Sequence, residues 1–91
     1  MIYRLIFSKE AQDDLRYLRK SEPKPYVKAL QLLEEIQEHP HFGRGKPKMM
    51  KGDLSGCWSR RISHRHRLVY RIEEQTVTVL VLSAGKHYDD K

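Results

Sequence analysis

Two arginines and a histidine form the chemically most suggestive group in this 91-residue sequence. Arg61 lies near the end of one β-rich stretch, Arg67 begins the next, and His87 follows a third stretch. Arginine is permanently charged and presents a planar fork of donors that fits phosphate oxygens, and histidine changes protonation near neutral pH. RNA cleavage can use the substrate's own 2′-hydroxyl as nucleophile, so the protein needs only a base, an acid and cations around the phosphate. These residue types therefore suit RNA cleavage.

The positive charge is concentrated in one part of the chain. The 18 Lys and Arg residues exceed the 12 Asp and Glu residues by six. Residues 43–71 hold nine cations and one acid, Asp53, so this segment carries +8 and the remainder −2. The nine cations are Arg44, Lys46, Lys48, Lys51, Arg60, Arg61, Arg65, Arg67 and Arg71. This balance favours an anionic partner, either nucleic acid or an acidic protein.

Local patterns predict a strand over residues 2–7 and then two helices. Ser8 is a good N-cap for a helix that ends near Lys20, and Pro23 and Pro25 separate it from a second helix over about 24–38. The predicted inner stripe of the second helix consists of Val27, Leu30, Leu33 and Ile36, widened by Tyr26, Ala29 and Leu32. Residues 41–56 read as a long loop with a short strand near 49–51.

Three strands are expected after this loop, over 57–62, 67–72 and 77–83. The order of elements predicts an α+β domain in which a helical hairpin covers one face of a mostly antiparallel, twisted sheet. Side-chain alternation that puts Trp58 and Tyr70 on the core face makes Arg61 pair across from Arg67. Two opposed arginines repel, so we expect an anion between them in the working protein. Arg60 falls on the apolar side, where its stem has to snorkel.

Length and composition exclude several classes of protein and site. The chain fits a single domain, 1–91, with a shallow surface site, and no run approaches the ~20 apolar residues of a membrane span. The lone Cys57 cannot form an intramolecular disulfide. We expect no membrane partner and a cytoplasmic location.

Metal chemistry is not expected. The pairs His39/His41 and His64/His66 have ligand-like spacing, but no Cys or carboxylate group accompanies them, and no acidic cluster could hold Mg²⁺. We therefore expect no metal and no cofactor. His64 and His66, at a hairpin tip, can instead contact RNA phosphates when protonated.

A family resemblance rests on several motifs together. These are Gly45-Lys46-Pro47, the run from Leu54 through Trp58 to Ile62 that reads LSGCWSRRI, His66 to Tyr70, and the terminal His87-Tyr88. The sequence resembles the Txe/YoeB group of the RelE/ParE toxin superfamily over its whole length. The resemblance implies a RelE/ParE-like fold with a basic concave sheet face. It also implies a bacterial toxin that enters the ribosomal A site, cuts mRNA there without a metal, and is neutralised by a small antitoxin.

Matching positions imply roles for individual residues. His87 resembles the general acid, Arg67 the arginine that stabilises the transition state, and Arg61 its companion. Tyr88 resembles the terminal tyrosine that helps set the substrate, and Lys51 a phosphate-contacting lysine. RNA-binding cations implied by the pattern are Lys46, Lys51, Arg44 and Arg65.

One position departs from the group's pattern. Where the group usually carries a glutamate as general base, this sequence has Lys48. A lysine among other cations can give up its proton and serve as the base, or the ribosome's own RNA positions the 2′-hydroxyl. The departure favours the alternative of a non-catalytic toxin on the same scaffold that binds DNA gyrase or the ribosome.

The expected partners follow from the charge and the resemblance. They are a cognate antitoxin, the bacterial ribosome and mRNA, with assembly as a homodimer or a toxin–antitoxin heterocomplex. The antitoxin should be acidic and partly disordered, because it must cover a strongly basic segment.

Overall fold

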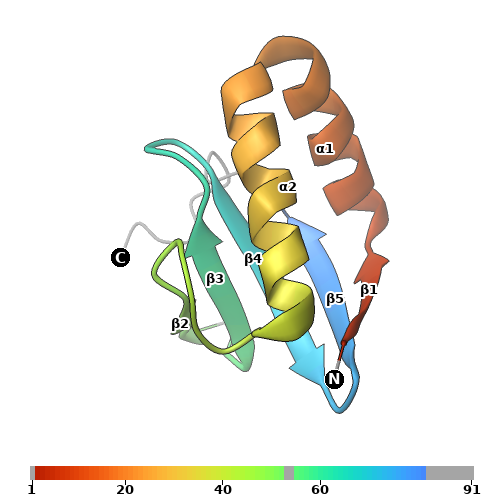
Figure 1. Cartoon of the computed structure of the whole chain (residues 1–91), viewed down its shortest axis with the longest axis vertical. Coiled ribbons are helices and arrows are strands. Elements are labelled where there is room, and N and C mark those ends of the chain that lie inside the picture. Colours follow the sequence, from red (N-terminus) through yellow and green to blue (C-terminus); the bar gives the residue numbers. More distant parts are fainter. Residues whose placement is uncertain (1, 53–54, 82–91) are drawn as a thin grey trace.

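Five strands form one mixed sheet, and two helices lie side by side across one of its faces (Figure 1). The computed structural model describes residues 2–52 and 55–81. Its elements are β1 (Arg4–Phe7), α1 (Lys9–Ser21), α2 (Pro23–Glu38), β2 (Lys48–Met49), β3 (Cys57–Arg61), β4 (Arg67–Glu73) and β5 (Thr76–Val81). This is the expected α+β architecture.

The sheet runs in the order β1-β5-β4-β3-β2. Among the described strands, β1 and β5 pair in parallel, and the other three pairs are antiparallel. A parallel pair needs a crossover connection, and the helical hairpin begins that connection by carrying the chain across the sheet. The expected mostly antiparallel sheet is therefore confirmed, with the first strand added at one edge.

The two helices begin where local signals place them. The Ser8 side chain caps α1 by accepting a hydrogen bond from the Ala11 amide at 3.0 Å. Pro23 occupies the first turn of α2, where a missing N–H is tolerated. Both predicted helices are thus confirmed to within a residue or two.

The buried stripe of α2 differs from the predicted one. Ala29, Leu32, Leu33 and Ile36 are buried, whereas Val27 is 52% exposed and Leu30 is 43% exposed. The inward assignment of Val27 and Leu30 was therefore wrong. The helix carries more apolar residues than one stripe needs, so the way in which α2 packs on the sheet selects which of them are buried.

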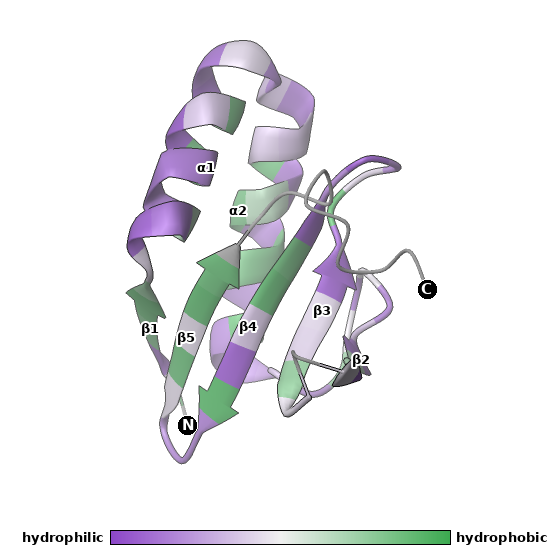
Figure 2. Ribbon diagram, turned by 180° about the vertical axis from the view of Figure 1, so that it is seen from behind, coloured by the Kyte–Doolittle hydropathy of each residue, from purple (hydrophilic) through white to green (hydrophobic). Residues whose placement is uncertain are grey.

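Strand alternation separates two sets of side chains. The helix-facing set joins the main core and includes Ile62, Leu68, Tyr70, Val77 and Val79. A smaller cluster of Met50, Cys57 and Val69 belongs to the other face, with Leu80 packed against it. Figure 2 views the sheet from this second side, where hydrophilic positions interrupt β3 and β4.

The predicted strands are found with small shifts. β2 lies at 48–49 rather than 49–51, and β5 begins one residue early. The last predicted strand positions, 82–83, lie outside the described residues. In the portion of the chain that the structure describes, neither helix has the length and apolarity to cross a membrane.

The buried stripe of α2 predicts the cost of truncating its side chains. Leu32→Ala should lower the free energy of unfolding by about 2–5 kcal/mol, because Leu32 is fully buried and its removal leaves a cavity. Val27→Ala, on the same helix, should cost well under about 1 kcal/mol. Urea unfolding followed by circular dichroism measures both, and equal losses would contradict the observed orientation of α2.

Candidate nucleic-acid interface

The sheet register pairs Arg61 of β3 directly with Arg67 of β4. This is the pairing that the sequence predicted. Arg61 is exposed and Arg67 is partly buried, and both Cα atoms sit at positions whose side chains point away from the helices. Two guanidinium groups on directly opposed positions create a concentrated positive potential.

Lys48 lies on the same side of the sheet. It pairs with Ser59, which is two positions before Arg61 and so shares its face. We call the surface carrying Lys48, Ser59, Arg61 and Arg67 the arginine face. The Ser59 hydroxyl is buried and has no hydrogen-bond partner among the described residues. The arginine face thus brings three of the predicted site residues together.

The other predicted RNA-binding cations lie on the segments before and after β2 and on the β3–β4 turn. Lys46 is exposed two residues before β2, and Arg65 is exposed in the β3–β4 turn. Arg44 is exposed, with its Nε 3.7 Å from the Glu35 carboxylate. Lys51 is exposed beyond the far end of β2 and is not brought close to the arginine pair.

His87 and Tyr88 lie outside the described residues, so their predicted roles stay predictions. Within the described ranges, no group of three or more His, Cys, Asp or Glu side chains is arranged to hold a metal ion.

Arg60 is the functional feature that the sequence interpretation missed. Its side chain is fully buried on the helix side of the sheet, so the expected snorkelling was wrong. All five N–H donors of a guanidinium are used here. Nε donates to the Tyr70 hydroxyl at 3.1 Å, and Nη1 donates to the Glu35 carboxylate at 2.6 Å. The remaining three bonds go to the main-chain carbonyls of His39, Phe42 and Arg44.

A sequence signal for this cluster did exist. Arg60 is in phase with the core residues of β3, and Glu35 follows the buried Leu32 by three positions on α2. An acid and an arginine that both face one core are expected to pair, because an unpaired buried charge is costly.

The surroundings of Arg60 shift the titration of two neighbouring groups. The Glu35 carboxylate accepts the Arg44 amide hydrogen at 2.8 Å, and this bond together with Arg60 lowers the Glu35 pKa from its usual 4.5 despite partial burial. Burial raises the pKa of the Tyr70 phenol, which stays neutral and donates to the Pro40 carbonyl at 2.8 Å. The cluster therefore works with an ionised Glu35 and a neutral Tyr70.

Two glycines permit the close approach of the main chain to this cluster. A Cβ on Gly43 would lie 2.4 Å from a Glu35 oxygen, and one on Gly45 would lie 3.0 Å from the Arg61 carbonyl. Lys46, directly after, has a left-handed φ of 51°, which is strained for a lysine. The loop therefore holds Lys46 in a conformation that its neighbours must enforce.

His66 does not serve as the sequence interpretation suggested. It is buried, and its Nε2 lies 3.1 Å from the Glu22 carboxylate at the start of α2. The hydrogen bond from His66 is the main reason that the Glu22 pKa lies below its usual value. His66 therefore joins the turn to the helices and is not available to contact phosphate, whereas His64 is exposed.

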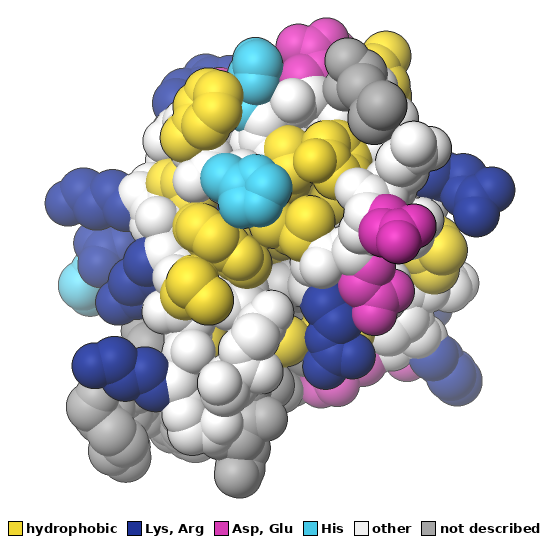
Figure 3. Space-filling view, turned by 90° about the horizontal axis from the view of Figure 1, so that it is seen from below, with side chains coloured by type: hydrophobic (Ala, Val, Ile, Leu, Met, Phe, Trp, Pro, Cys, Tyr) yellow, Lys and Arg dark blue, Asp and Glu magenta, His cyan; other side chains and the backbone are white. Residues whose placement is uncertain are grey.

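Hydrophobic and histidine side chains gather on the end of the molecule that Figure 3 shows from below. His39 stacks on Phe42 with ring centroids 4.7 Å apart, and His41 meets Trp58 edge-on at 5.3 Å. Phe42 and Met49 are exposed by 61% and 60%. Trp58 is half-buried, so it packs against the core while one edge contacts this patch.

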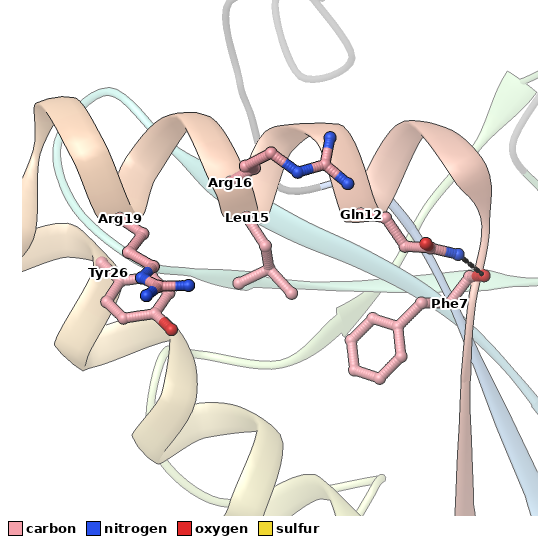
Figure 4. A pocket seen from close by; sticks show the side chains of 6 residues that line it. All are labelled: Phe7, Gln12, Leu15, Arg16, Arg19 and Tyr26. Atoms are coloured by element: carbon pink, nitrogen blue, oxygen red, sulfur yellow. Dashed lines mark hydrogen bonds between the residues drawn. The ribbon is translucent and has the colours of Figure 1, made fainter.

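A surface pocket of about 270 Å³ lies on the helical side of the molecule (Figure 4). Its lining residues are Phe7, Gln12, Leu15, Arg16, Arg19 and Tyr26. None of the predicted site residues is among them. The candidate interface is therefore the arginine face and its neighbouring loop rather than a deep cavity.

Comparison with known proteins agrees with this geometry. Residues 7–88 match the family described as the YoeB-like toxin of bacterial type II toxin-antitoxin systems. The chain belongs to this toxin family. It is 36% identical over 85 residues to Toxin YoeB of Escherichia coli, covering 93% of this chain and 99% of that protein.

Solved structures of YoeB toxins share the fold. A YoeB dimer from Staphylococcus aureus superposes with a TM-score of 0.82 at 32% identity, covering 91% of this chain and 97% of that chain. A heterotetrameric YoeB–YefM toxin–antitoxin complex from the same organism gives 0.80 at the same identity and coverage. The expected RelE/ParE-like fold is thereby confirmed for this YoeB-like chain.

The lowered pKa of Glu35 predicts how stability depends on pH. A carboxyl whose pKa is lower in the folded state stabilises the fold above the usual value of 4.5, and this stabilisation is lost as pH falls through the lowered pKa. Between pH 6 and about pH 3, wild type should therefore lose more unfolding free energy than Glu35→Gln. Urea unfolding at each pH tests this, with Glu34→Gln as the exposed control that should follow wild type. Parallel pH curves for wild type and Glu35→Gln would contradict the prediction.

Proposed function

We propose that this chain, as a single toxin domain over residues 1–91, is a ribosome-dependent endoribonuclease that cleaves mRNA in the ribosomal A site and so inhibits translation. Cleavage proceeds by attack of the substrate's 2′-hydroxyl and uses no metal. The chain is a member of the YoeB-like toxin family, and this cleavage is the activity that we propose for it.

The opposed pair of Arg61 and Arg67 is the observation that carries this proposal. Two arginines at directly paired strand positions concentrate positive charge and so favour an anion between them. A scissile phosphate supplies that anion, and it gains further negative charge in the transition state, where preorganised donors are worth most. Lys48 lies on the same face of the sheet.

The proposed cleavage reaction assigns a separate role to each of a few residues. A base removes the proton of the 2′-hydroxyl, whose oxygen attacks the phosphorus while Arg67 and Arg61 stabilise the growing charge. His87 donates a proton to the departing 5′ oxygen, and Tyr88 helps to set the substrate. The base is either Lys48 or the ribosomal RNA environment that orients the hydroxyl. Lys46, Lys51, Arg44 and Arg65 contact RNA phosphates.

An antitoxin partner follows from family membership and charge. The similar S. aureus toxin is described both as a dimer and as a heterotetramer with its antitoxin YefM. We propose that this chain also binds a cognate antitoxin, as a heterocomplex or as a homodimer in its absence. The antitoxin should be acidic, because residues 43–71 carry +8.

Lys48 is the observation that favours a second candidate function. It occupies the position where the group usually has a glutamate base. A toxin that has lost the base but kept the cations would bind the ribosome, or DNA gyrase, without cutting RNA.

The direct test uses purified protein, ribosomes programmed with a defined mRNA, and primer extension to map 3′ ends. We expect a cut within the A-site codon that requires the ribosome and survives EDTA, because the proposed chemistry uses no metal. The same mRNA without ribosomes is the control. Intact mRNA on stalled ribosomes would support the non-catalytic candidate, and inhibition of gyrase would then be measured.

Single substitutions test the roles on the proposed site. His87→Gln should slow cleavage by about 10²- to 10⁴-fold while ribosome binding stays near that of wild type, because only proton transfer is removed. Arg67→Ala should slow it by about 10²- to 10³-fold through lost charge stabilisation. Arg19→Ala, which changes an exposed arginine of α1 away from the arginine face, is the matched control. An unchanged cleavage rate for His87→Gln would contradict the assignment of the general acid.

A further inference from the structure

Main-chain carbonyls of the loop after α2 are bound by side chains and backbone of the sheet. The Arg60 guanidinium donates hydrogen bonds to the carbonyls of His39, Phe42 and Arg44, and the Tyr70 hydroxyl donates to that of Pro40. The next carbonyl, that of Gly45, accepts the amide hydrogen of Arg61 at 2.7 Å. Five of the seven carbonyls from residue 39 to residue 45 therefore have a donor on β3 or β4, and the path of this loop is set by the sheet.

Glu35, on α2, binds both Arg60 and the loop. Its carboxylate holds Arg60 at 2.6 Å and the Arg44 amide at 2.8 Å through one oxygen. The loop is thus held between α2 and β3 by an ion pair whose arginine is fully buried. We call Arg60 and Glu35, with the main-chain carbonyls that Arg60 binds and the Arg44 amide that Glu35 binds, the Arg60 clamp.

The clamp is continuous with the proposed site. Arg60 and Arg61 are neighbours on β3, so their side chains point to opposite faces, one into the clamp and one onto the arginine face. On the loop, Lys46 follows directly after Gly45, and Lys48 follows two residues later. β2 contains only two residues, so its own pairing does little to fix Lys48. The positions of both lysines therefore depend on the anchored residues before them.

We propose that Arg60 and Glu35 are positioning residues of the cleavage site, which hold the 39–48 segment so that Lys46 and Lys48 lie beside Arg61. The proposal rests on the proposed function, because it assigns these lysines to the RNA substrate. Neither Arg60 nor Glu35 touches the substrate. They act through the loop they hold.

The chemistry of the clamp requires these residue types. A lysine at position 60 has three donors without a planar fork, so it cannot replace five bonds in fixed directions. A glutamine at position 35 keeps the shape of the side chain but loses the charge that strengthens both of its bonds. Gly43 lies so close to the Glu35 carboxylate that a side chain there would displace either the carboxylate or the loop and so disturb the clamp.

Amide exchange followed by NMR tests whether the clamp holds the loop. The amides of Arg44 and Arg61 report on it directly, because the first binds Glu35 and the second binds Gly45. In Glu35→Gln and Arg60→Lys we expect both to exchange at least about tenfold faster, with amides of the β4–β5 pair unchanged. Glu34→Gln and Arg19→Lys, at exposed positions of the helices, should match wild type. Unchanged exchange at Arg44 and Arg61 in both clamp variants would overturn the proposal.

Cleavage kinetics test whether the conformation of the 39–48 segment affects the rate of the reaction. Under single turnover with saturating toxin, the rate constant per ribosome does not depend on the folded fraction, so a purely structural role leaves it unchanged. We expect Glu35→Gln to lower this rate constant by about 10- to 100-fold, because misplacement of a binding group by about 1 Å costs that much. A rate constant equal to that of Glu34→Gln would overturn the positioning role.

The two proposals fail in different ways. If wild type does not cleave, the proposed function is overturned, and with it the assignment of the clamp to cleavage. Exchange at Arg44 and Arg61 still decides whether the clamp fixes the loop. If wild type cleaves and both clamp variants cleave as fast as wild type, only the positioning role is overturned.

Glu35→Gln is the primary variant, because Arg60→Lys removes bonds from the core and can prevent folding.

Discussion

A fully buried guanidinium is the constraint on which the site-bearing half of this structure depends. Removing a charge from water is costly, and the protein offsets that cost only when a counter-charge and every donor are satisfied. Arg60 meets this condition with one carboxylate, one phenol and three carbonyls. Three of these acceptors belong to the loop, so the loop can follow only the path that completes the set. An irregular segment thereby acquires a defined conformation without secondary structure of its own.

The two faces of β3 divide stability from function. Arg60 faces the helices and is neutralised by Glu35, whereas Arg61 faces the other way and is paired in register only with Arg67. The same residue type is therefore neutralised by a carboxylate on one face and set opposite a like charge on the other. Strain at functional sites has this form, in which the surrounding fold maintains an arrangement that a ligand relieves. The left-handed Lys46, fixed between the clamp and β2, is a second instance.

Much of the fold could be read from local sequence signals. Ser8 and Pro23 marked the helix starts, Gly and Pro marked the loop, and alternation gave the strands and the Arg61–Arg67 register. These signals succeed because capping, backbone restriction and side-chain period act over a few residues. The charge excess of residues 43–71 was likewise visible in the sequence. Together they indicated the fold class, the basic surface and three residues of the arginine face.

Only the tertiary structure decided how charged and apolar groups were shared between elements. It turned Val27 and Leu30 of α2 outward, because the stripe that packs depends on how the helix crosses the sheet. It buried His66 against Glu22 and Arg60 against Glu35, partners that lie 44 and 25 positions apart in the chain. Local periodicity can place such a residue toward the core, but it does not encode the distant partner, since the energy of the pair exists only once distant elements exclude water from between its members. The sequence by itself determined the elements and the excess of cations, and packing determined which cations are structural and which remain for a partner.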